Sequence, residues 1–308
     1  MTRVISSLAA GIDGGIVTYF HTPIQHRTMD DLERRRALVE DRLEAVCEVV
    51  EPDTLGARIA HVALSGGKRV RPTVTMLACE AAGGDSEAAV DFAVGIELVH
   101  SASLVVDDII DDSAVRRGTD SAWASFGYGP ALITSDGLLG EAFALFATDE
   151  RAMEVVSEAL VELGEGEATE LVDHPTAEDE YMELARRKTG ALFRAAAELG
   201  AVAADADART VEAFGEYAEG VGVAFQIRDD VLDATADADD LGKPTGQDSA
   251  MERPSFVEIT NLTPEEGTER ARRKADAALS ALDSVELADE RAAGYLRDLA
   301  EFVVERER

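Results

Sequence analysis

With 308 residues, 46% of them hydrophobic, the chain is long enough to bury one large core. A formal net charge of −33 excludes nucleic acid as a partner, because phosphate backbones are bound by Lys and Arg. The same charge predicts adaptation to high salt, where the Debye length falls to ~3 Å and repulsion between surface carboxylates is screened. We therefore expect one soluble, cytoplasmic domain from a halophilic, archaeal source.

Apolar residues recur at three- and four-residue intervals along most of the chain, and aromatic residues make up only 5% of it. This texture predicts an all-α bundle of long helices. Residues 1–28 lack the periodicity, and we interpret them as a flexible N-terminal extension before a domain over residues 29–308. A capped helix start is expected at Met29-Asp30-Asp31-Leu32. We find no membrane-spanning run of ~20 apolar residues and expect membrane contact to be peripheral at most.

Basic residues are unevenly chosen, since 25 are Arg and only four are Lys, namely Lys68, Lys188, Lys243 and Lys274. A lysine ammonium is a compact, strongly hydrated point charge, so a chain that uses it sparingly is expected to keep it where that charge matters. The first of these lysines lies in the segment Gly66–Pro72, which places three cations beside two glycines. Glycines allow the backbone to approach a phosphate closely, so this segment predicts an anion site.

A cluster of carboxylates follows an apolar stretch: Asp107, Asp108 and Asp111 stand at i, i+1 and i+4. On a helix these side chains meet on one side, and their mutual repulsion is unfavourable unless a cation lies between them. Hard oxygen ligands suit Mg²⁺. For this block alone, a solvated acidic helix end explains the pattern equally well. His100 stands two helical turns earlier on the same face.

The same spacing returns in Asp229, Asp230 and Asp233, again after an apolar run. Two such clusters are hard to explain as solvated surface residues. If they face each other, they would hold several Mg²⁺ ions around one diphosphate, and we expect three ions. Three short basic segments would supply cations to oppose the phosphates: Arg116-Arg117-Gly118, Lys188-Thr189-Gly190 and Gly242-Lys243-Pro244.

In this order and spacing, the blocks from Gly66 to about Ser255 resemble the trans-polyprenyl diphosphate synthase family, which has the all-α isoprenoid synthase fold and includes farnesyl and geranylgeranyl diphosphate synthases. The resemblance implies a homodimeric, magnesium-dependent trans-prenyltransferase. Such an enzyme joins isopentenyl diphosphate to an allylic prenyl diphosphate.

The resemblance also implies roles for individual residues. The diphosphate of isopentenyl diphosphate would be held by Lys68, Arg71, His100 and Arg117. The magnesium ligands would be Asp107, Asp108, Asp111, Asp229, Asp230 and Asp233. Contacts to the allylic diphosphate would come from Arg116, Lys188, Thr189, Gln226 and Lys243.

The chain departs from the family pattern at three places. After Arg116-Arg117-Gly118, the residues Asp120, Ser121 and Trp123 replace a Pro-Thr pair and a His. Arg253 and Ser255 replace a Lys-x-Thr pair, and Arg253 keeps the positive charge at this substrate-binding position. Glu167 stands where Gln is common. None of these changes removes a magnesium ligand, so we expect an active enzyme.

Chemistry of this kind ionises a carbon–oxygen bond, and Mg²⁺ with Lys188, Arg116 and Lys243 would stabilise the departing diphosphate. The size of the product is expected to depend on Ala102, Ser103 and Val99, which lie below Asp107 on the same helix. Because none of the three is aromatic, we predict a product of geranylgeranyl length or longer.

Two alternatives stay open. A class I terpene cyclase of the same fold shares the acidic clusters, but it does not need the separate anion site predicted at Gly66–Pro72. A non-catalytic regulatory subunit or paralogue is kept open by the altered stretch from Asp120 to Trp123.

Overall fold

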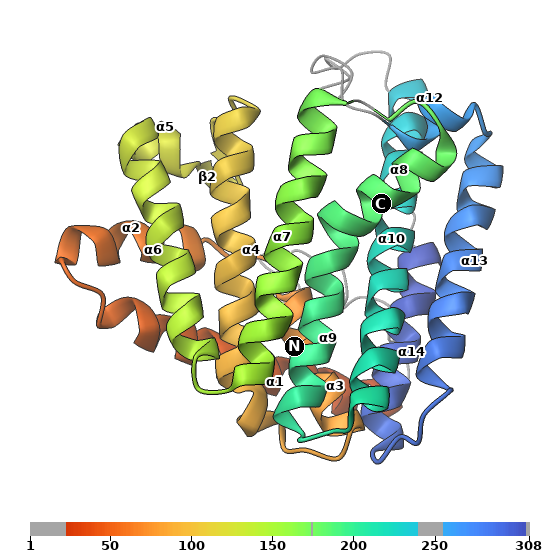
Figure 1. Ribbon diagram of the computed structural model, residues 1–308, viewed down its shortest axis with the longest axis horizontal. Helices are drawn as coiled ribbons and strands as arrows, with labels where there is room; N and C mark the ends of the chain where they lie inside the picture. Colours follow the sequence, from red (N-terminus) through yellow and green to blue (C-terminus); the bar gives the residue numbers. More distant parts are fainter. Residues whose placement is uncertain (1–22, 174, 240–254, 306–308) are drawn as a thin grey trace, which may run out of the picture.

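The computed structural model describes residues 23–173, 175–239 and 255–305, most of which are helical (Figure 1). In chain order the elements are α1 Pro23–Glu48, α2 Asp53–Ala63, α3 Val70–Ala81, η3 Ser86–Ala89, α4 Val90–Ile110, β1 Val115–Arg116, β2 Thr119–Asp120, α5 Ala122–Phe126, α6 Tyr128–Phe146, α7 Glu150–Val172, α8 Glu178–Ala185, η4 Arg186–Gly190, α9 Ala191–Ala203, α10 Ala208–Asp239, α12 Phe256–Thr260, α13 Pro264–Leu282 and α14 Glu290–Glu305. The prediction of an all-α bundle is confirmed.

Helix starts follow local capping chemistry where the sequence provides it. Asp149 accepts hydrogen bonds from the backbone N–H groups of Arg151 and Ala152 and so begins α7. Thr263 and Glu266 form a capping box ahead of α13. The first helix begins at Pro23, six residues before the expected start at Met29, because a helix can continue past the last turn that shows an apolar period. The boundary of the domain at residue 29 stays a prediction.

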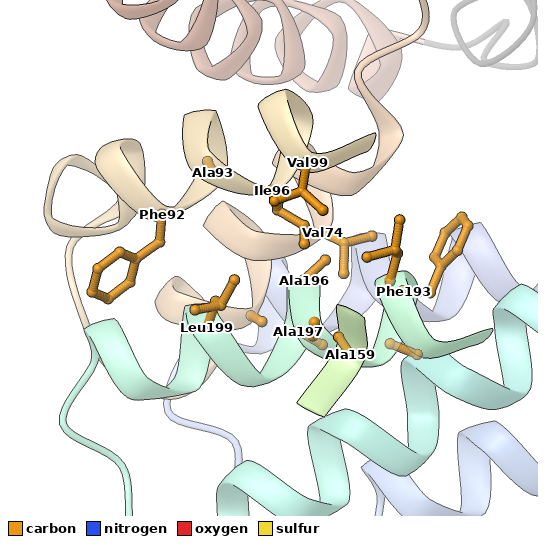
Figure 2. Packing of buried hydrophobic residues seen from close by; sticks show 14 of the residues in the cluster. Val74, Phe92, Ala93, Ile96, Val99, Ala159, Phe193, Ala196, Ala197 and Leu199 are labelled. Atoms are coloured by element: carbon orange, nitrogen blue, oxygen red, sulfur yellow. The ribbon is translucent and has the colours of Figure 1, made fainter. Parts of the chain in front are cut away.

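The core is centred on α4, which packs against α3, α6 and α9. Figure 2 shows Ile96 and Val99 of α4 lying over Val74 of α3 and Ala196 of α9, and all four are buried. The segment Ser86–Ile110 is long and apolar enough to cross a membrane by length and composition alone. Its most apolar window is 67% buried inside the protein, however, as expected of a core helix.

The carboxyl ends of α4, α7 and α10 lie at one end of the bundle, at the top of Figure 1. The short antiparallel hairpin of β1 and β2 lies at the same end, with Val115 paired to Asp120 and Arg116 paired to Thr119. Both aspartate blocks stand at the carboxyl-terminal parts of their helices, on α4 and α10. The fold therefore gathers both aspartate blocks and the hairpin that carries Arg116 at this end.

Candidate active site

The loop before α3 is built around one buried arginine, Arg69, which is only 2% exposed. Its guanidinium makes ion pairs with Glu97 at 2.6 Å and Glu40 at 2.9 Å, and it donates to the carbonyl oxygen of Ala63 at 2.7 Å. Arg69 adopts the left-handed region with φ 49°. Of the three cations in this segment, Arg69 thus holds the loop in place, whereas Lys68 is exposed to solvent.

Arg117 reaches this loop from the hairpin and lies across the two glycines. Its Nη1 donates to the carbonyl oxygen of Gly66 at 2.5 Å. A Cβ atom at Gly67 would stand 2.9 Å from the Arg117 guanidinium carbon, so the side chain rests where only glycine leaves room. Gly67 also has φ +124°, which disfavours any other residue.

Arg71 and His100 complete the first cationic group. The Arg71 guanidinium lies 4.7 Å from the ring centre of Phe193, and burial lowers the pKa of Arg71 to about 10. Within the described part of the chain its Nε is buried and has no hydrogen-bond partner, although such atoms are rarely left unpaired. Burial, followed by the charges of Arg71 and Arg117, holds the pKa of His100 well below its usual range. The group is therefore a partly buried pair of cations suited to an anion, with a neutral imidazole beside it.

The first aspartate block lies at the end of α4. Asp108 is 3% exposed and accepts hydrogen bonds from Nε and Nη2 of Arg116, with Nε at 2.8 Å. Burial raises the pKa of Asp108, and the Arg116 hydrogen bond opposes that rise. Asp107 and Asp111 are both less buried than Asp108. The middle aspartate thus fixes the hairpin to α4.

The second aspartate block lies on α10, and its middle member is again engaged by the protein. Asp230 accepts hydrogen bonds from Tyr181 Oη at 2.7 Å, Gln226 Nε2 at 3.0 Å and the backbone N–H of Phe256 at 2.6 Å. Burial raises the pKa of Asp230 to about 6. Tyr181 was not predicted as a site residue, because an apolar-face tyrosine 49 residues away carries no sequence signal for this contact.

Lys188 lies in η4, a single π-helical turn between α8 and α9. Such turns occur often at functional sites. A Cβ atom at Gly166 of α7 would stand 3.1 Å from the backbone nitrogen of Lys188, so this glycine gives the turn room. The next residue, Thr189, donates from its hydroxyl to Gln226 Oε1 at 2.9 Å and ties η4 to α10.

The Lys188 ammonium is surrounded by carboxylates. It contacts Glu170 as a hydrogen-bonded ion pair and Glu167 at 3.4 Å, both on α7. Burial lowers the pKa of Lys188, but the charges of Glu170, Glu167 and Asp107 together raise it above its ordinary value. The negative charge of Asp107 acts on Lys188, so the first aspartate block lies near this ammonium. Residues of α4, α7, η4 and α10 therefore converge on one site.

The predicted metal ligands fit Mg²⁺ by their chemistry, because all six are carboxylates. In the described residues no three His, Cys, Asp or Glu side chains converge closely enough to hold an ion by themselves. Mg²⁺ commonly keeps several waters and takes phosphate oxygens as further ligands, so substrate would complete such a site. Two predicted positions, Lys243 and Arg253, lie outside the described residues.

The segment Asp120–Trp123, where the sequence departs from the family pattern, runs from the end of β2 into α5. Trp123 Nε1 donates to the carbonyl oxygen of Ser113 at 2.9 Å, and its ring stacks on Tyr128 with ring centres 5.1 Å apart. Tyr128 in turn donates to Asp112 at 3.0 Å. These contacts hold the segment between the first aspartate block and Arg116, so the altered residues keep the hairpin folded.

The residues expected to set product length differ in their surroundings. Ser103 is half-buried on the face of α4 that also carries His100 and Asp107. Ala102 is 2% exposed, and its carbonyl accepts a hydrogen bond from Ser135 of α6 at 3.1 Å. Val99 is fully buried in the packed core. Of the three, Ser103 is the one on the face of the candidate site.

Two aspartate blocks with basic side chains beside them in an all-α bundle define the isoprenoid synthase class. A family model described as polyprenyl synthetase matches residues 52–287. The chain therefore belongs to the polyprenyl synthetase family, and it is a prenyltransferase.

Known proteins similar to this chain make products of different lengths. A short chain isoprenyl diphosphate synthase of Methanothermobacter thermautotrophicus is 33% identical over 80% of this chain and 78% of its own length. An octaprenyl diphosphate synthase of Escherichia coli is 32% identical over 76% of this chain and 72% of its own. The structure also aligns with the crystal structure of a geranylgeranyl pyrophosphate synthetase from Pyrococcus horikoshii, with a TM-score of 0.81 and 31% sequence identity. The alignment covers 92% of this chain and 99% of that chain.

Proposed function

We propose that this protein elongates an allylic prenyl diphosphate by condensing it with isopentenyl diphosphate, to a product of geranylgeranyl length or longer. The observation that carries the proposal is the presence of two separate basic positions beside the aspartate blocks. One is the pair Arg71 and Arg117 with the neutral His100 beside it, and the other is the Lys188 ammonium among its carboxylates. A condensing enzyme has two diphosphates to place, whereas a cyclase has one.

The first group suits isopentenyl diphosphate. The buried Arg71 Nε has no partner in the described residues, and Arg117 lies beside it on Gly67. Phosphate oxygens would accept hydrogen bonds from both guanidinium groups, and Arg binds them through its planar fork. A neutral His100 would donate one further hydrogen bond without adding charge. Lys68, which is exposed, would contribute at the rim.

The second group suits the allylic diphosphate, which must leave with its bonding electron pair. Mg²⁺ held by the aspartate blocks would neutralise charge on this leaving group. Lys188 would donate to it, and Arg116, Lys243 and Arg253 would add positive charge around it. Thr189 and Gln226 are tied to each other at 2.9 Å beside this position, where they would orient the allylic end. The double bond of isopentenyl diphosphate would then attack the allylic cation, and the released diphosphate would take up the proton that leaves last.

The protein is also proposed to be a cytoplasmic homodimer. Leu132 and Ile133 of α6 are 48% and 56% exposed, and burial against a second copy would remove this apolar surface from water. Light scattering after size-exclusion chromatography would give twice the chain mass of 32.8 kDa, and a monomer at working concentration would refute this part.

The experiment that tests the proposal is an incubation of purified protein in high salt with Mg²⁺, labelled isopentenyl diphosphate and each allylic primer in turn. Chromatography of the dephosphorylated products is expected to show a ladder ending at geranylgeranyl or a longer chain. Cyclic hydrocarbon formed from the allylic primer without incorporation of label would favour a cyclase. A folded protein that binds Mg²⁺ and diphosphate but neither incorporates label nor consumes any primer would support a non-catalytic role.

A further inference from the structure

The hairpin that carries Arg117 turns through a sparsely populated backbone conformation. Arg117 and Gly118 form its two-residue turn, and both have positive φ angles, of 52° and 78°. Turns of this kind favour Asn or Asp at the first position, and a long side chain such as Arg is uncommon in the left-handed region. Such conformations persist only where the surrounding structure holds them. The position of the Arg117 guanidinium therefore depends on what holds the two strands.

Helix α2 holds the second strand through His61. The imidazole Nε2 lies 2.9 Å from the carbonyl oxygen of Asp120, 59 residues further along the chain. A carbonyl oxygen can only accept, so Nε2 carries the proton and donates this hydrogen bond. The hydroxyl oxygen of Ser125 lies 3.4 Å from the same nitrogen, and the half-buried ring stands edge-on to Phe126, with ring centres 5.0 Å apart. His61 therefore joins α2 to the end of β2 and to α5.

The same end of α2 also fixes the loop before α3. The carbonyl oxygen of Ala63, the last residue of α2, accepts a hydrogen bond from Arg69 at 2.7 Å. Arg69 directly precedes α3, whose first turn carries Arg71. His61 stands only two residues before Ala63. One helix end therefore sets the spacing between Arg71, which it reaches through the loop, and Arg117, which it reaches through the hairpin.

We propose that His61 is a positioning residue for the isopentenyl diphosphate site, because it holds β2 where Arg117 lies beside Arg71. Arg116, the other arginine of the hairpin, depends less on this contact, since two hydrogen bonds fix it to the buried Asp108. Loss of the His61 hydrogen bond should therefore weaken binding of isopentenyl diphosphate more than binding of the allylic primer. This inference rests on the proposed function of Arg117 as a ligand of isopentenyl diphosphate.

The test compares wild type with His61→Leu and His61→Gln in steady-state kinetics, with each substrate varied in turn. Leucine keeps an apolar contact with Phe126 but has no donor, whereas a glutamine amide can donate from close to the position of Nε2. His61→Leu is expected to raise the KM for isopentenyl diphosphate about three- to tenfold, from the loss of one hydrogen bond. The KM for the allylic primer and kcat should change by less than about twofold, because that site is separate. His61→Gln should keep all three values close to those of wild type.

Arg58→Gln is the matched control. Arg58 lies on the same helix, and its guanidinium stands over the Phe126 ring, 5.7 Å from the ring centre, so the variant loosens α5 without touching the His61 hydrogen bond. Both KM values should stay at those of wild type. An equal KM for isopentenyl diphosphate in wild type and His61→Leu would overturn the inference, and so would an equal rise in His61→Gln or in Arg58→Gln.

Hydrogen exchange measured by mass spectrometry separates this inference from the proposed function. Residues 114–121 should exchange faster in His61→Leu than in wild type, while His61→Gln should exchange as wild type does. Wild type that incorporates no label would refute the proposed function. Even then, unchanged exchange in the hairpin of His61→Leu would overturn the role of His61, and faster exchange would support it.

Discussion

At the scale of single residues, the clearest relation between sequence and site is the contact between Gly67 and Arg117. These residues are 50 positions apart, yet the absence of a Cβ at one decides where the guanidinium of the other lies. Gly66, its neighbour, also has a positive φ, of +91°, but a Cβ there would meet nothing within 4 Å. A comparison of Gly67 with Gly66 therefore separates two effects of an added Cβ. Both positions would suffer backbone strain, but only Gly67 would bring a Cβ into contact with Arg117.

Gly67→Ala is expected to raise the KM for isopentenyl diphosphate at least ~10-fold, since displacing a charged hydrogen-bond donor costs about 1.5–3 kcal/mol. The KM for the allylic primer should change much less, because Lys188 belongs to a different group. Steady-state kinetics with each substrate varied in turn would measure both.

Gly66→Ala is the matched control for this prediction. It introduces a positive-φ strain of about 1–3 kcal/mol, but its added Cβ would meet no atom within 4 Å and so would not push on the Arg117 side chain. If both variants raised the KM for isopentenyl diphosphate equally, strain in the loop and not the position of Arg117 would be responsible.

Residue types and spacing indicate candidate members of the site, but they do not indicate the partners that hold those residues in place. The period of a helix is enough to place His100 and Asp107 on one face of α4. It says nothing about Asp108 binding Arg116 through a hairpin, or about Tyr181 reaching Asp230 across two helices. Those contacts depend on how elements pack, and Lys243 and Arg253 lie outside the described residues.

At the scale of elements, α4 carries the first aspartate block above a face of small side chains. Ser103→Phe is expected to shorten the product, because an aromatic ring one turn below Asp107 would occupy the space for a growing chain. Chromatography of dephosphorylated products would show the ladder ending earlier. Ser103→Ala should leave the ladder unchanged.

Ala102→Phe should also shorten the product, but at a greater loss of stability, since Ala102 is nearly fully buried and overpacking costs about 1–3 kcal/mol. Unchanged product length in both phenylalanine variants would show that other helices set the limit.

Helix α9 buries a charge that should make stability depend on pH. Glu198 is 9% exposed, and burial raises its pKa to about 7 despite an ion pair with Arg194 at 2.8 Å. In the unfolded chain a Glu has a pKa near 4.3. Glu198 has a higher pKa in the folded chain than in the unfolded chain, so the folded state binds its proton more tightly. The contribution of this proton to the free energy of unfolding is present below about pH 4 and is lost as pH rises through about 7.

Glu198→Gln imitates the protonated form, so its advantage in unfolding free energy over wild type should grow between about pH 4 and pH 8. We expect a gain of about 1–3 kcal/mol at pH 8, measured by denaturant titration at constant high salt. Glu212→Gln changes a 59%-exposed partner of the same Arg194 and should show no such growth. A difference between wild type and Glu198→Gln that stays flat with pH would contradict the burial argument.

Elements were predictable where a period or a cap marks them. The long helices follow from apolar spacing. The two-residue strands of the hairpin are too short to show a period, and the π-helical turn at Lys188 has no composition signal. Both arise from packing against neighbouring helices.

At the scale of the whole molecule, the dominant property is the charge of −33. Many ion pairs lie on the surface, and single surface pairs contribute only about 0–1 kcal/mol each. Self-repulsion among the excess carboxylates should therefore set the salt dependence of stability.

Raising NaCl from about 0.1 M to about 3 M should raise the Tm by at least ~10 °C, because screening becomes effective within ~3 Å. Differential scanning calorimetry at several salt concentrations would measure it. A Tm that does not fall when salt is removed would argue against adaptation to high salt.

The burial of α4 has a consequence for synthesis of the chain. Of the helices that cover it, α6 and α9 come later, and Ala203 at the end of α9 follows Ile110 by 93 residues. At about 5–20 residues per second, the ribosome takes ~5–20 s to make that length. During this interval the nascent chain presents a 25-residue segment with the hydropathy of a membrane span. Chaperone demand in the cell should therefore be greatest while this stretch awaits its covering helices.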